Sequence, residues 1–172
     1  MQNQYLKAQG VTAFELMLVV GIIGTLSAVA VPMYQDIIVK NQLMMAVESL
    51  RSDMQYARTQ ALKKGQNVVI SRTPGTTGSW CYGLNVEVNC NCKVIGSCLI
   101  KTISGSDFGT AINMASSSSS NSTFDLRRGT IGANGVNFTT DRYVARVVFS
   151  NVGRVRICTP IGNVGLPSYP YC

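Results

Sequence analysis

The chain has 172 residues, carries 15 Lys and Arg residues against eight Asp and Glu residues, and has a net charge of +7 at pH 7. This length leaves room for one long helix and one domain of about 105 residues, and it excludes two independent globular domains. Hydrophobic residues make up 46% of the chain and charged residues only 13%, which excludes a chain that is disordered throughout. The basic excess permits partners such as nucleic acid or another anionic surface.

The first feature along the chain is an apolar stretch from Val11 to Val31, which follows a short polar segment, residues 1–10, ending in Gly10. At about 1.5 Å of helical rise per residue, this stretch matches the roughly 30 Å hydrocarbon thickness of a bilayer and predicts a transmembrane helix. Its single charge is Glu15. A carboxylate is costly in lipid and usually marks a function with a specific partner, and a free amino group created by cleavage after Gly10 would be such a partner.

The arrangement of a short basic leader ending in Gly10, an apolar helix with Glu15 as its fifth residue and Pro32 beyond it resembles a type IV prepilin. The resemblance implies that residues 1–10 are a leader which a prepilin peptidase removes, and that the same enzyme methylates Val11. It also implies that Glu15 acts in assembly with other pilins, first from the inner membrane with the rest of the chain in the periplasm, and then in a pilus or pseudopilus. Val11 departs from the family, which usually has Phe at this position.

Two simpler interpretations of this segment compete with the prepilin resemblance. An ordinary secretory signal has an apolar core of about 7–15 residues followed by a small-x-small cleavage site, whereas this apolar run is longer and ends at Pro32. A plain single-pass anchor would require neither Glu15 nor the junction at Gly10. These features therefore favour the prepilin.

A helical pattern continues beyond the apolar stretch. Apolar residues recur at spacings of four and three, which is typical of an amphipathic helix that packs on a domain. This apolar stripe consists of Leu43, Val47, Leu50, Met54, Ala57 and Ala61. Polar residues are expected on the other faces of the helix: Lys40, Arg51, Asp53 and Gln55.

The end of the helix is marked by Lys63 and Lys64, which are favourable near the negative helix terminus, and by Gly65, which can take the left-handed cap. We therefore expect one helix over residues 11–64. Its first part, residues 11–31, is the transmembrane or filament-core segment, and its second part, residues 32–64, is amphipathic.

From Asn67 onward the pattern changes to the period of two that is typical of strands. The candidate strands are Val68–Arg72, Trp80–Val86, Cys98–Ile103, Ser122–Leu126, Gly135–Phe138, Tyr143–Ser150 and Arg154–Cys158. The sequence thus predicts an α+β fold in which a long N-terminal helix, like that of a type IV pilin, packs on a small antiparallel β-sheet domain, residues 65–172. Met114, Ala115 and the serine run over 116–120 predict a mobile loop.

Six cysteines follow the apolar stretch, and none lies within it. If this part of the chain faces an oxidising compartment, the cysteines predict disulfides, which stabilise a small domain. Cys158 with Cys172 is the preferred pair, because it would tie down a Gly- and Pro-rich tail. The other four would pair among themselves, although residues only two apart rarely meet disulfide geometry: Cys81, Cys90, Cys92 and Cys98. A zinc site from these four is the rival, but they lack paired C-x-x-C spacing.

Arginine is concentrated late in the chain. After Asn121 there are no lysines and six arginines: Arg127, Arg128, Arg142, Arg146, Arg154 and Arg156. A planar guanidinium can make two parallel hydrogen bonds to a phosphate. The use of arginine instead of lysine in this part of the chain therefore favours phosphate recognition. Strand alternation places Arg154 and Arg156 on one face, and Arg146 can join them across a hairpin that turns at Gly153. The competing interpretation is an exposed strand whose charges discourage edge pairing.

The run Gly153-Arg154-Val155-Arg156 resembles the Gly-Arg-x-Arg signature of the FimT branch of the GspH/FimT minor-pilin family. The resemblance implies a minor type IV pilin that binds DNA without sequence preference during natural transformation, with Arg154 and Arg156 as binding residues. Charge and strand phase add four further residues: Arg146, Arg142, Arg127 and Arg128. The alternative is a minor pseudopilin of a type II secretion system, as in the GspH branch, with a structural filament role and no DNA binding.

The sequence argues against an enzyme, a cofactor or a metal site. It contains no His, no Walker-type phosphate loop and no C-x-x-C motif, since the Cys90 and Cys92 pair is one residue too close. No aromatic residue lies between Arg154 and Arg156, so base stacking on Tyr143 or Tyr169 is a minor expectation. The expected partners are therefore DNA phosphates, other pilins, prepilin peptidase and the inner membrane.

Overall fold

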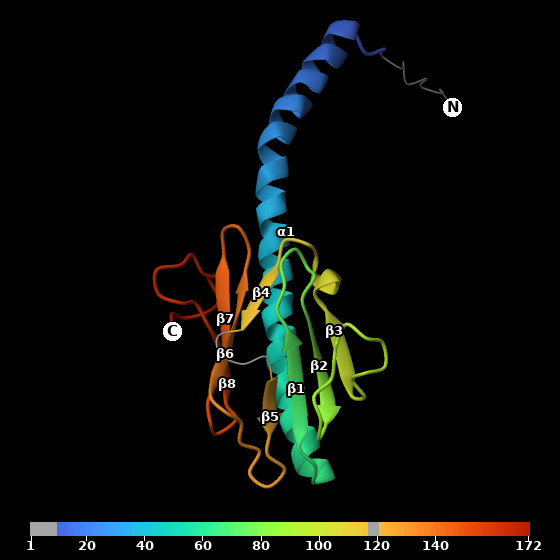
Figure 1. The fold of residues 1–172 in the computed structure, drawn as a ribbon. Coiled ribbons are helices and arrows are strands. Elements are labelled where there is room, and N and C mark those ends of the chain that lie inside the picture. The colour runs from blue at the N-terminus through green and yellow to red at the C-terminus, as the bar shows by residue number, and fades with distance from the viewer. Residues whose placement is uncertain (1–9, 117–120) are drawn as a thin grey trace, which may run out of the picture. The chain divides into compact units, whose positions relative to one another are not determined.

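The computed structural model describes residues 10–116 and 121–172 (Figure 1). One long helix, α1 (Ala13–Lys64), precedes eight strands and a short 3-10 helix, η1 (Gly105–Phe108). The strands are β1 (Val68–Thr73), β2 (Cys81–Val86), β3 (Lys101–Ser104), β4 (Asn113–Ser116), β5 (Asn121–Phe124), β6 (Asn134–Thr139), β7 (Val144–Phe149) and β8 (Val155–Cys158). The chain divides into two compact units, one up to Ile38 and the other from Val39 to Cys172.

The helix α1 begins at Ala13, so the expected start at Val11 is wrong by two residues. The reason is a cap, because the Thr12 hydroxyl accepts a hydrogen bond from the Glu15 backbone N–H at 3.3 Å. Threonine followed three residues later by glutamate is a common start of a helix. Glu15 also carries a negative charge in the first turn, where the helix dipole favours it.

In the unit up to Ile38, apolar side chains are exposed all along the helix. Phe14 is 76% exposed and Leu26 is 66% exposed. By length and composition, this part of α1 is apolar enough to cross a membrane. A continuous apolar surface of this kind requires lipid or another protein to cover it.

In the unit from Val39 onward, the eight strands form two four-stranded antiparallel sheets. The first sheet has the order β3-β2-β1-β5, and the second has the order β4-β6-β7-β8. β8 is therefore an edge strand, which places the residues of the β7–β8 hairpin at one margin of the domain. The expected α+β architecture of a long helix on antiparallel sheets is confirmed.

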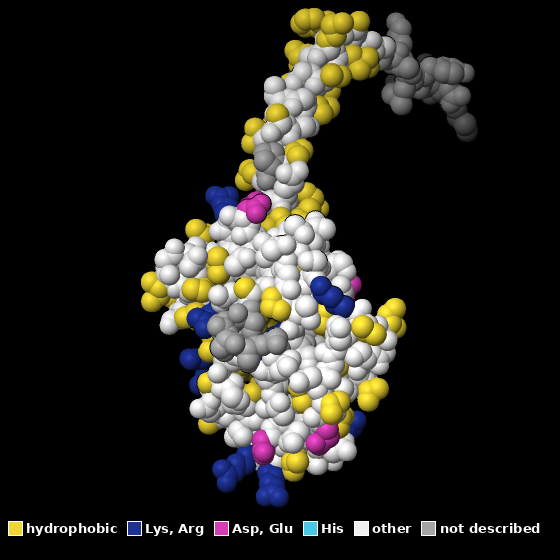
Figure 2. Space-filling view, viewed as in Figure 1, with side chains coloured by type: hydrophobic (Ala, Val, Ile, Leu, Met, Phe, Trp, Pro, Cys, Tyr) yellow, Lys and Arg dark blue, Asp and Glu magenta, His cyan; other side chains and the backbone are white. Residues whose placement is uncertain are grey.

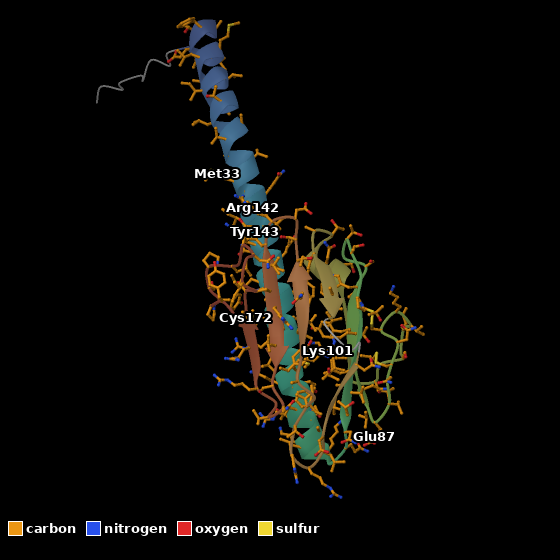
Figure 3. All side chains as sticks on the ribbon, turned by 60° about the vertical axis from the view of Figure 1, so that its left-hand side comes forward. Met33, Glu87, Lys101, Arg142, Tyr143 and Cys172 are labelled. Atoms are coloured by element: carbon orange, nitrogen blue, oxygen red, sulfur yellow. A yellow bond between two sulfur atoms is a disulfide. The ribbon has the colours of Figure 1, made fainter. Side chains whose placement is uncertain are left out.

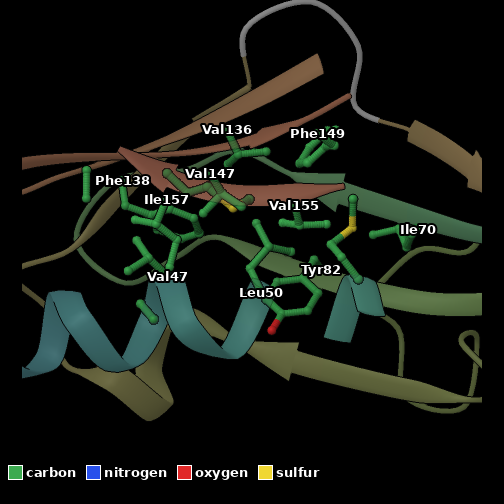
Figure 4. Packing of buried hydrophobic residues seen from close by; sticks show 14 of the residues in the cluster. Val47, Leu50, Ile70, Tyr82, Val136, Phe138, Val147, Phe149, Val155 and Ile157 are labelled. Carbon is green, nitrogen blue, oxygen red and sulfur yellow. The ribbon is translucent and has the colours of Figure 1, made fainter. Parts of the chain in front are cut away.

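The core of this unit lies between α1 and the inner faces of both sheets (Figure 4). All six members of the predicted apolar stripe, from Leu43 to Ala61, are 0% exposed. They pack with strand residues such as Tyr82 of the first sheet and Val147 of the second. The helical spacing of the stripe thus correctly identified the face that α1 buries.

Asp53 was expected on a polar face of the helix, away from the core, but its side chain is buried. The Tyr82 hydroxyl donates to one carboxylate oxygen of Asp53 at 2.9 Å, and the Lys101 ammonium lies 2.6 Å from the other. Ser49 adds a hydrogen bond of 2.9 Å to the same Tyr82 hydroxyl. Burial, followed by the charge of Asp53, raises the pKa of Tyr82, so the phenol stays protonated and donates. The ion pair and the hydrogen bond offset the free-energy cost of burying the Asp53 carboxylate beside the core.

The predicted loop over residues 114–120 is wrong in its first part. Asn113–Ser116 forms β4, which pairs with β6 in antiparallel register. Met114 is 2% exposed and belongs to the core, so one buried side chain anchors a strand that is too short to show a period of two in the sequence. Residues 117–120 of the serine run lie outside the described residues.

The six cysteines form three disulfides. Cys158 pairs with Cys172, the pair preferred from the sequence. The other bonds join Cys81 to Cys92 and Cys90 to Cys98, and they close the segment between β2 and β3. Since every cysteine is bonded in this way, none presents a thiolate for zinc.

Leu50 provides a test of the helix packing. We expect Leu50→Ala to lower the free energy of unfolding of residues 39–172 by about 2–5 kcal/mol, because Leu50 is fully buried between α1 and the sheets. Urea denaturation measures the loss. The control is Leu62→Ala, which removes the same atoms from a side chain that is 48% exposed on the same helix. Equal losses in the two variants would contradict this account of the core.

Candidate nucleic-acid interface

The hairpin of β7 and β8 presents two faces of different chemistry. Ala145, Val147 and Phe149 are buried, whereas Arg146 points to the opposite face. In the antiparallel register, Arg146 lies opposite Cys158, and Arg156 lies opposite Val148, two residues further along the strand. Side chains at i and i+2 share a face, so Arg146 and Arg156 are diagonal neighbours on the outer face of the second sheet. The predicted phase of the strands therefore holds.

The turn between these strands is tight and depends on Gly153. The Gly153 N–H donates to the Ser150 carbonyl at 2.9 Å, and the Ser150 N–H donates to the Arg154 carbonyl at 3.0 Å. Gly153 has a φ of +75°, which favours glycine. A Cβ atom at this position would also lie 2.6 Å from the Gly129 carbonyl oxygen, so both the backbone and the packing require a glycine here.

Arg58 of α1 lies next to this turn. Its Nε atom would lie 3.1 Å from a Cβ at Gly153 and 3.1 Å from a Cβ at Gly129. The two glycines therefore leave the space that the Arg58 side chain occupies. This packing brings a guanidinium from the helix to the hairpin that carries Arg154.

Three adjoining hollows follow the β7–β8 hairpin. The first, of about 440 Å³, is lined by Arg51, Gln55, Arg58, Thr59, Gly153, Arg154 and Val155. The second, of about 270 Å³, is lined by Arg51, Arg154, Val155, Arg156, Ile157, Tyr169 and Pro170. The third, of about 340 Å³, is lined by Arg146, Val148, Arg156, Ile157, Cys158, Pro170, Tyr171 and Cys172. Because each hollow shares lining residues with the next, we treat the three together as the arginine groove.

The arginine groove is strongly basic. It is lined by five guanidinium groups, those of Arg58, Arg51, Arg154, Arg156 and Arg146. None of the residues that line it in the described part of the chain is Asp or Glu. Figure 2 shows Lys and Arg side chains along the left edge and at the lower end of the domain. Such a surface attracts phosphates and other anions.

One carboxylate lies next to the groove and partly balances it. Glu48 lies 3.4 Å from Arg51, and both side chains are half-exposed, so this ion pair is weak. The Tyr169 hydroxyl donates to the same carboxylate at 2.8 Å. Burial, together with this hydrogen bond to Glu48, raises the pKa of Tyr169. Tyr169 therefore holds Glu48 with its hydroxyl, which leaves Arg51 partly neutralised and Arg154 and Arg156 exposed.

Arg127 and Arg128 lie in a loop beside the β7–β8 turn. The Ile131 N–H donates to the Asn151 carbonyl at 3.2 Å, which joins this loop to the turn. The backbone N–H groups of Arg128 and Arg127 donate to the Asp125 carboxylate and hold its pKa below the usual range. Both arginine side chains are exposed, so they extend the basic surface beyond the groove.

Two other arginines are not part of the groove. Arg142 precedes β7, at the end of the strand away from the turn, and its guanidinium lies 5.8 Å from the centre of the Tyr143 ring. Figure 3 shows Arg142 beside Tyr143 and apart from Cys172. Arg72 is 2% exposed and donates to Ser122 at 2.8 Å, and its burial lowers its pKa to about 10. The structure thus groups five of the six predicted arginines near the hairpin and separates Arg142 from them.

Sequence reasoning missed three residues of the groove. Arg51 was expected only on a polar helix face and Arg58 was not singled out, yet they are seven residues apart, two helical turns, and therefore share one face. That spacing was a usable signal. The predicted Cys158–Cys172 disulfide was a partial signal for Tyr171, because this bond, together with the backbone hydrogen bonds of Thr159, brings residue 171 to the groove.

Comparisons with known proteins agree with this architecture. The family described as type II transport protein GspH matches residues 46–153. Two curated relatives, each described as a fimbrial protein of Pseudomonas aeruginosa, are 44% identical over 73 residues, which is 42% of this chain. The match spans about half, 47%, of the length of those relatives.

The similarity extends to a solved structure. The crystal structure of the type IV minor pilin FimU of Pseudomonas aeruginosa PAO1 matches with a TM-score of 0.51 and 18% identity, and the match covers 70% of this chain and 94% of FimU. At this identity the match shows the fold alone. Because the family match covers more than half of the sequence, the chain belongs to the GspH/FimT family of type IV pilin-like proteins.

Proposed function

We propose that this chain is a minor type IV pilin of the FimT branch, and that its β domain binds DNA without sequence preference during DNA uptake in natural transformation. The observation that carries the proposal is the arginine groove, in which five guanidinium groups line adjoining hollows without an acidic side chain in the described lining. A solvated strand face would account for Arg154 and Arg156 alone. It would not account for Arg51 and Arg58, which come from the helix to the same place.

Binding would be mainly electrostatic. A guanidinium can hold a phosphate through two parallel hydrogen bonds, and each phosphate that is neutralised releases condensed counterions. The logarithm of the affinity for duplex DNA should therefore fall with the logarithm of the salt concentration by about 0.9 per phosphate contact. One subunit offers only a few such contacts, so several subunits in one filament would strengthen binding through effective concentration.

Removing Arg154 and Arg156 tests the proposal. We expect the double variant Arg154→Gln with Arg156→Gln, in residues 39–172, to bind labelled duplex DNA about tenfold or more weakly at low salt. The salt slope should also fall by about one for each phosphate that the variant no longer neutralises. Gel-shift titration at two or more salt concentrations measures both quantities.

The matched control removes the same charge away from the groove. Lys93→Gln with Arg142→Gln changes the net charge equally, and neither residue lines the groove. This variant should keep most of the affinity and the salt slope. Binding that is unchanged by loss of Arg154 and Arg156, with an unchanged slope, would refute the proposed site.

The amino-terminal segment would carry the domain into a filament. In this proposal a prepilin peptidase cuts after Gly10 and methylates Val11, and the apolar part of α1 first lies in the inner membrane with the β domain in the periplasm. In the pilus, the same exposed apolar surface would pack against the helices of other pilins. Glu15 would then neutralise the amino terminus of a neighbouring subunit, which offsets the cost of burying both charges.

Glu15→Leu should leave membrane insertion and cleavage after Gly10 intact and reduce incorporation into filaments. Cell fractionation and immunoblotting of sheared pili measure these steps. Thr12→Ala is the control, because it removes the helix cap but keeps the carboxylate, at a cost of about 1 kcal/mol to the helix. If both variants lose incorporation equally, Glu15 acts through the start of the helix and the intermolecular role is wrong.

A second candidate function is that of a minor pseudopilin of a type II secretion system. The description of the matching family, type II transport protein GspH, favours this candidate. Such a protein would use the same helix and β domain to build a periplasmic filament. It would have no evident need for a basic groove.

Deletion of the gene separates the two candidates. For the DNA-binding pilin we expect transformation to be lost while secretion of extracellular proteins is retained, because only DNA uptake uses the groove. Transformation frequency and the amount of secreted protein are measured in the same strain. The opposite pair of results would favour the pseudopilin.

A further inference from the structure

The third hollow of the arginine groove differs from the other two because an exposed aromatic ring lines it. Tyr171 is 70% exposed and lies with Arg146 and Arg156 around a volume of about 340 Å³. We call these three residues and their hollow the tyrosine pocket. This volume is within the usual range of about 300–1,000 Å³ for small-molecule sites.

The backbone at Tyr171 is held in place on both sides of the residue. The Thr159 N–H donates to the Pro170 carbonyl at 2.8 Å, and the Cys172 N–H donates to the Thr159 carbonyl at 2.8 Å. The disulfide between Cys158 and Cys172 closes the same loop. An exposed aromatic side chain on a fixed backbone costs little further entropy when a ligand stacks on it.

The arginines of the pocket are also positioned. Arg146 is half-buried, and its Nε would lie 2.6 Å from a Cβ at Gly135, so the guanidinium occupies space that the absence of a side chain at Gly135 leaves open. Arg156 is exposed on the neighbouring strand. Two cations and one aromatic side chain around the same hollow fit a ligand that has both negative charge and a flat ring.

We propose that the tyrosine pocket binds one unpaired nucleotide of a single-stranded DNA, with the base stacked on Tyr171 and adjacent phosphates bound by Arg146 and Arg156. This inference rests on the proposed DNA binding and names the form of DNA that the site prefers. A base inside a duplex is stacked on its neighbours and offers no free face, whereas a single strand offers one at every nucleotide. The two other hollows would bind the phosphates that follow along the strand.

The test compares three probes on the full chain in detergent: oligothymidylate of about ten nucleotides, an abasic strand with the same number of phosphates, and a duplex of the same length. We expect oligothymidylate to bind about fivefold or more tightly than the abasic strand, because base stacking on an aromatic side chain adds to the phosphate contacts. Fluorescence anisotropy at constant salt measures the three affinities.

Tyr171→Leu should remove this advantage, so that oligothymidylate and the abasic strand bind this variant with about equal affinity. Tyr171→Phe is the matched control, since it keeps the ring and should keep the advantage. Because Tyr171 is largely exposed, both variants should melt at about the wild-type temperature, which circular dichroism checks.

The outcomes are distinguishable. Equal affinity of the wild-type chain for oligothymidylate and the abasic strand, with duplex binding retained, would overturn the tyrosine pocket alone. An advantage that survives in Tyr171→Leu would overturn the role of Tyr171. Binding of none of the three probes by the wild-type chain would overturn the proposed DNA binding and this inference with it.

Discussion

The burial of one stripe of α1 against both sheets is the constraint on which the rest of the domain depends. Fully burying a large apolar side chain such as Leu50 or Met54 stabilises a fold by about 1.5–3 kcal/mol, and the stripe contains several. The same burial fixes the rotation of the helix about its axis. Arg51 follows Leu50 and Arg58 follows Ala57, so both guanidinium groups lie beside the stripe and reach the edge at which β8 lies. The groove is thus a consequence of the packing of the core.

Gathering five guanidinium groups opposes stability, because like charges repel. Several features of the groove reduce this electrostatic repulsion. Arg154 and Arg156 are exposed, where water and salt screen their charges, and Glu48 partly neutralises Arg51. Tyr169 holds Glu48 with its hydroxyl and keeps this carboxylate beside the helix. A bound phosphate would relieve the remaining repulsion, so the arrangement favours an anionic ligand over an empty surface.

Local patterns explain which parts of this structure were predictable. The buried stripe, most strands and the phase of the β7–β8 hairpin follow from periods of 3.6 and 2, which the sequence displays directly. Strand β4 did not show such a pattern, because Met114 is the one side chain of residues 113–115 that is buried in the core. Asp53 was misplaced for a related reason, since its partners Tyr82 and Lys101 come from strands far along the chain. The partners of a polar group decide its burial, and a single sequence does not display them.

The residues of the arginine groove were likewise predictable only in part from a single sequence. Its central residues, Arg154 and Arg156, lie two residues apart in one short segment and carry a recognisable local signature. The other contributors come from α1 and from residues 159–172, and only the folded chain brings them together. Arg58 is the clearest example, because it comes from α1 and lines the same hollow as Arg154, 96 positions later in the chain.

The two kinds of interaction proposed for the groove would differ in their response to salt. Counterion release would make phosphate contacts of Arg51, Arg58 and Arg154 weaken steeply as salt rises, whereas stacking on Tyr171 would depend on contact area and on exclusion of water. A groove built only of guanidinium groups would release DNA uniformly as the ionic strength increases. With one stacking position, as we propose for Tyr171, a single strand would stay bound at salt concentrations that release a duplex. The proposed site would thus give a sequence-independent electrostatic surface a means of distinguishing single-stranded from duplex DNA.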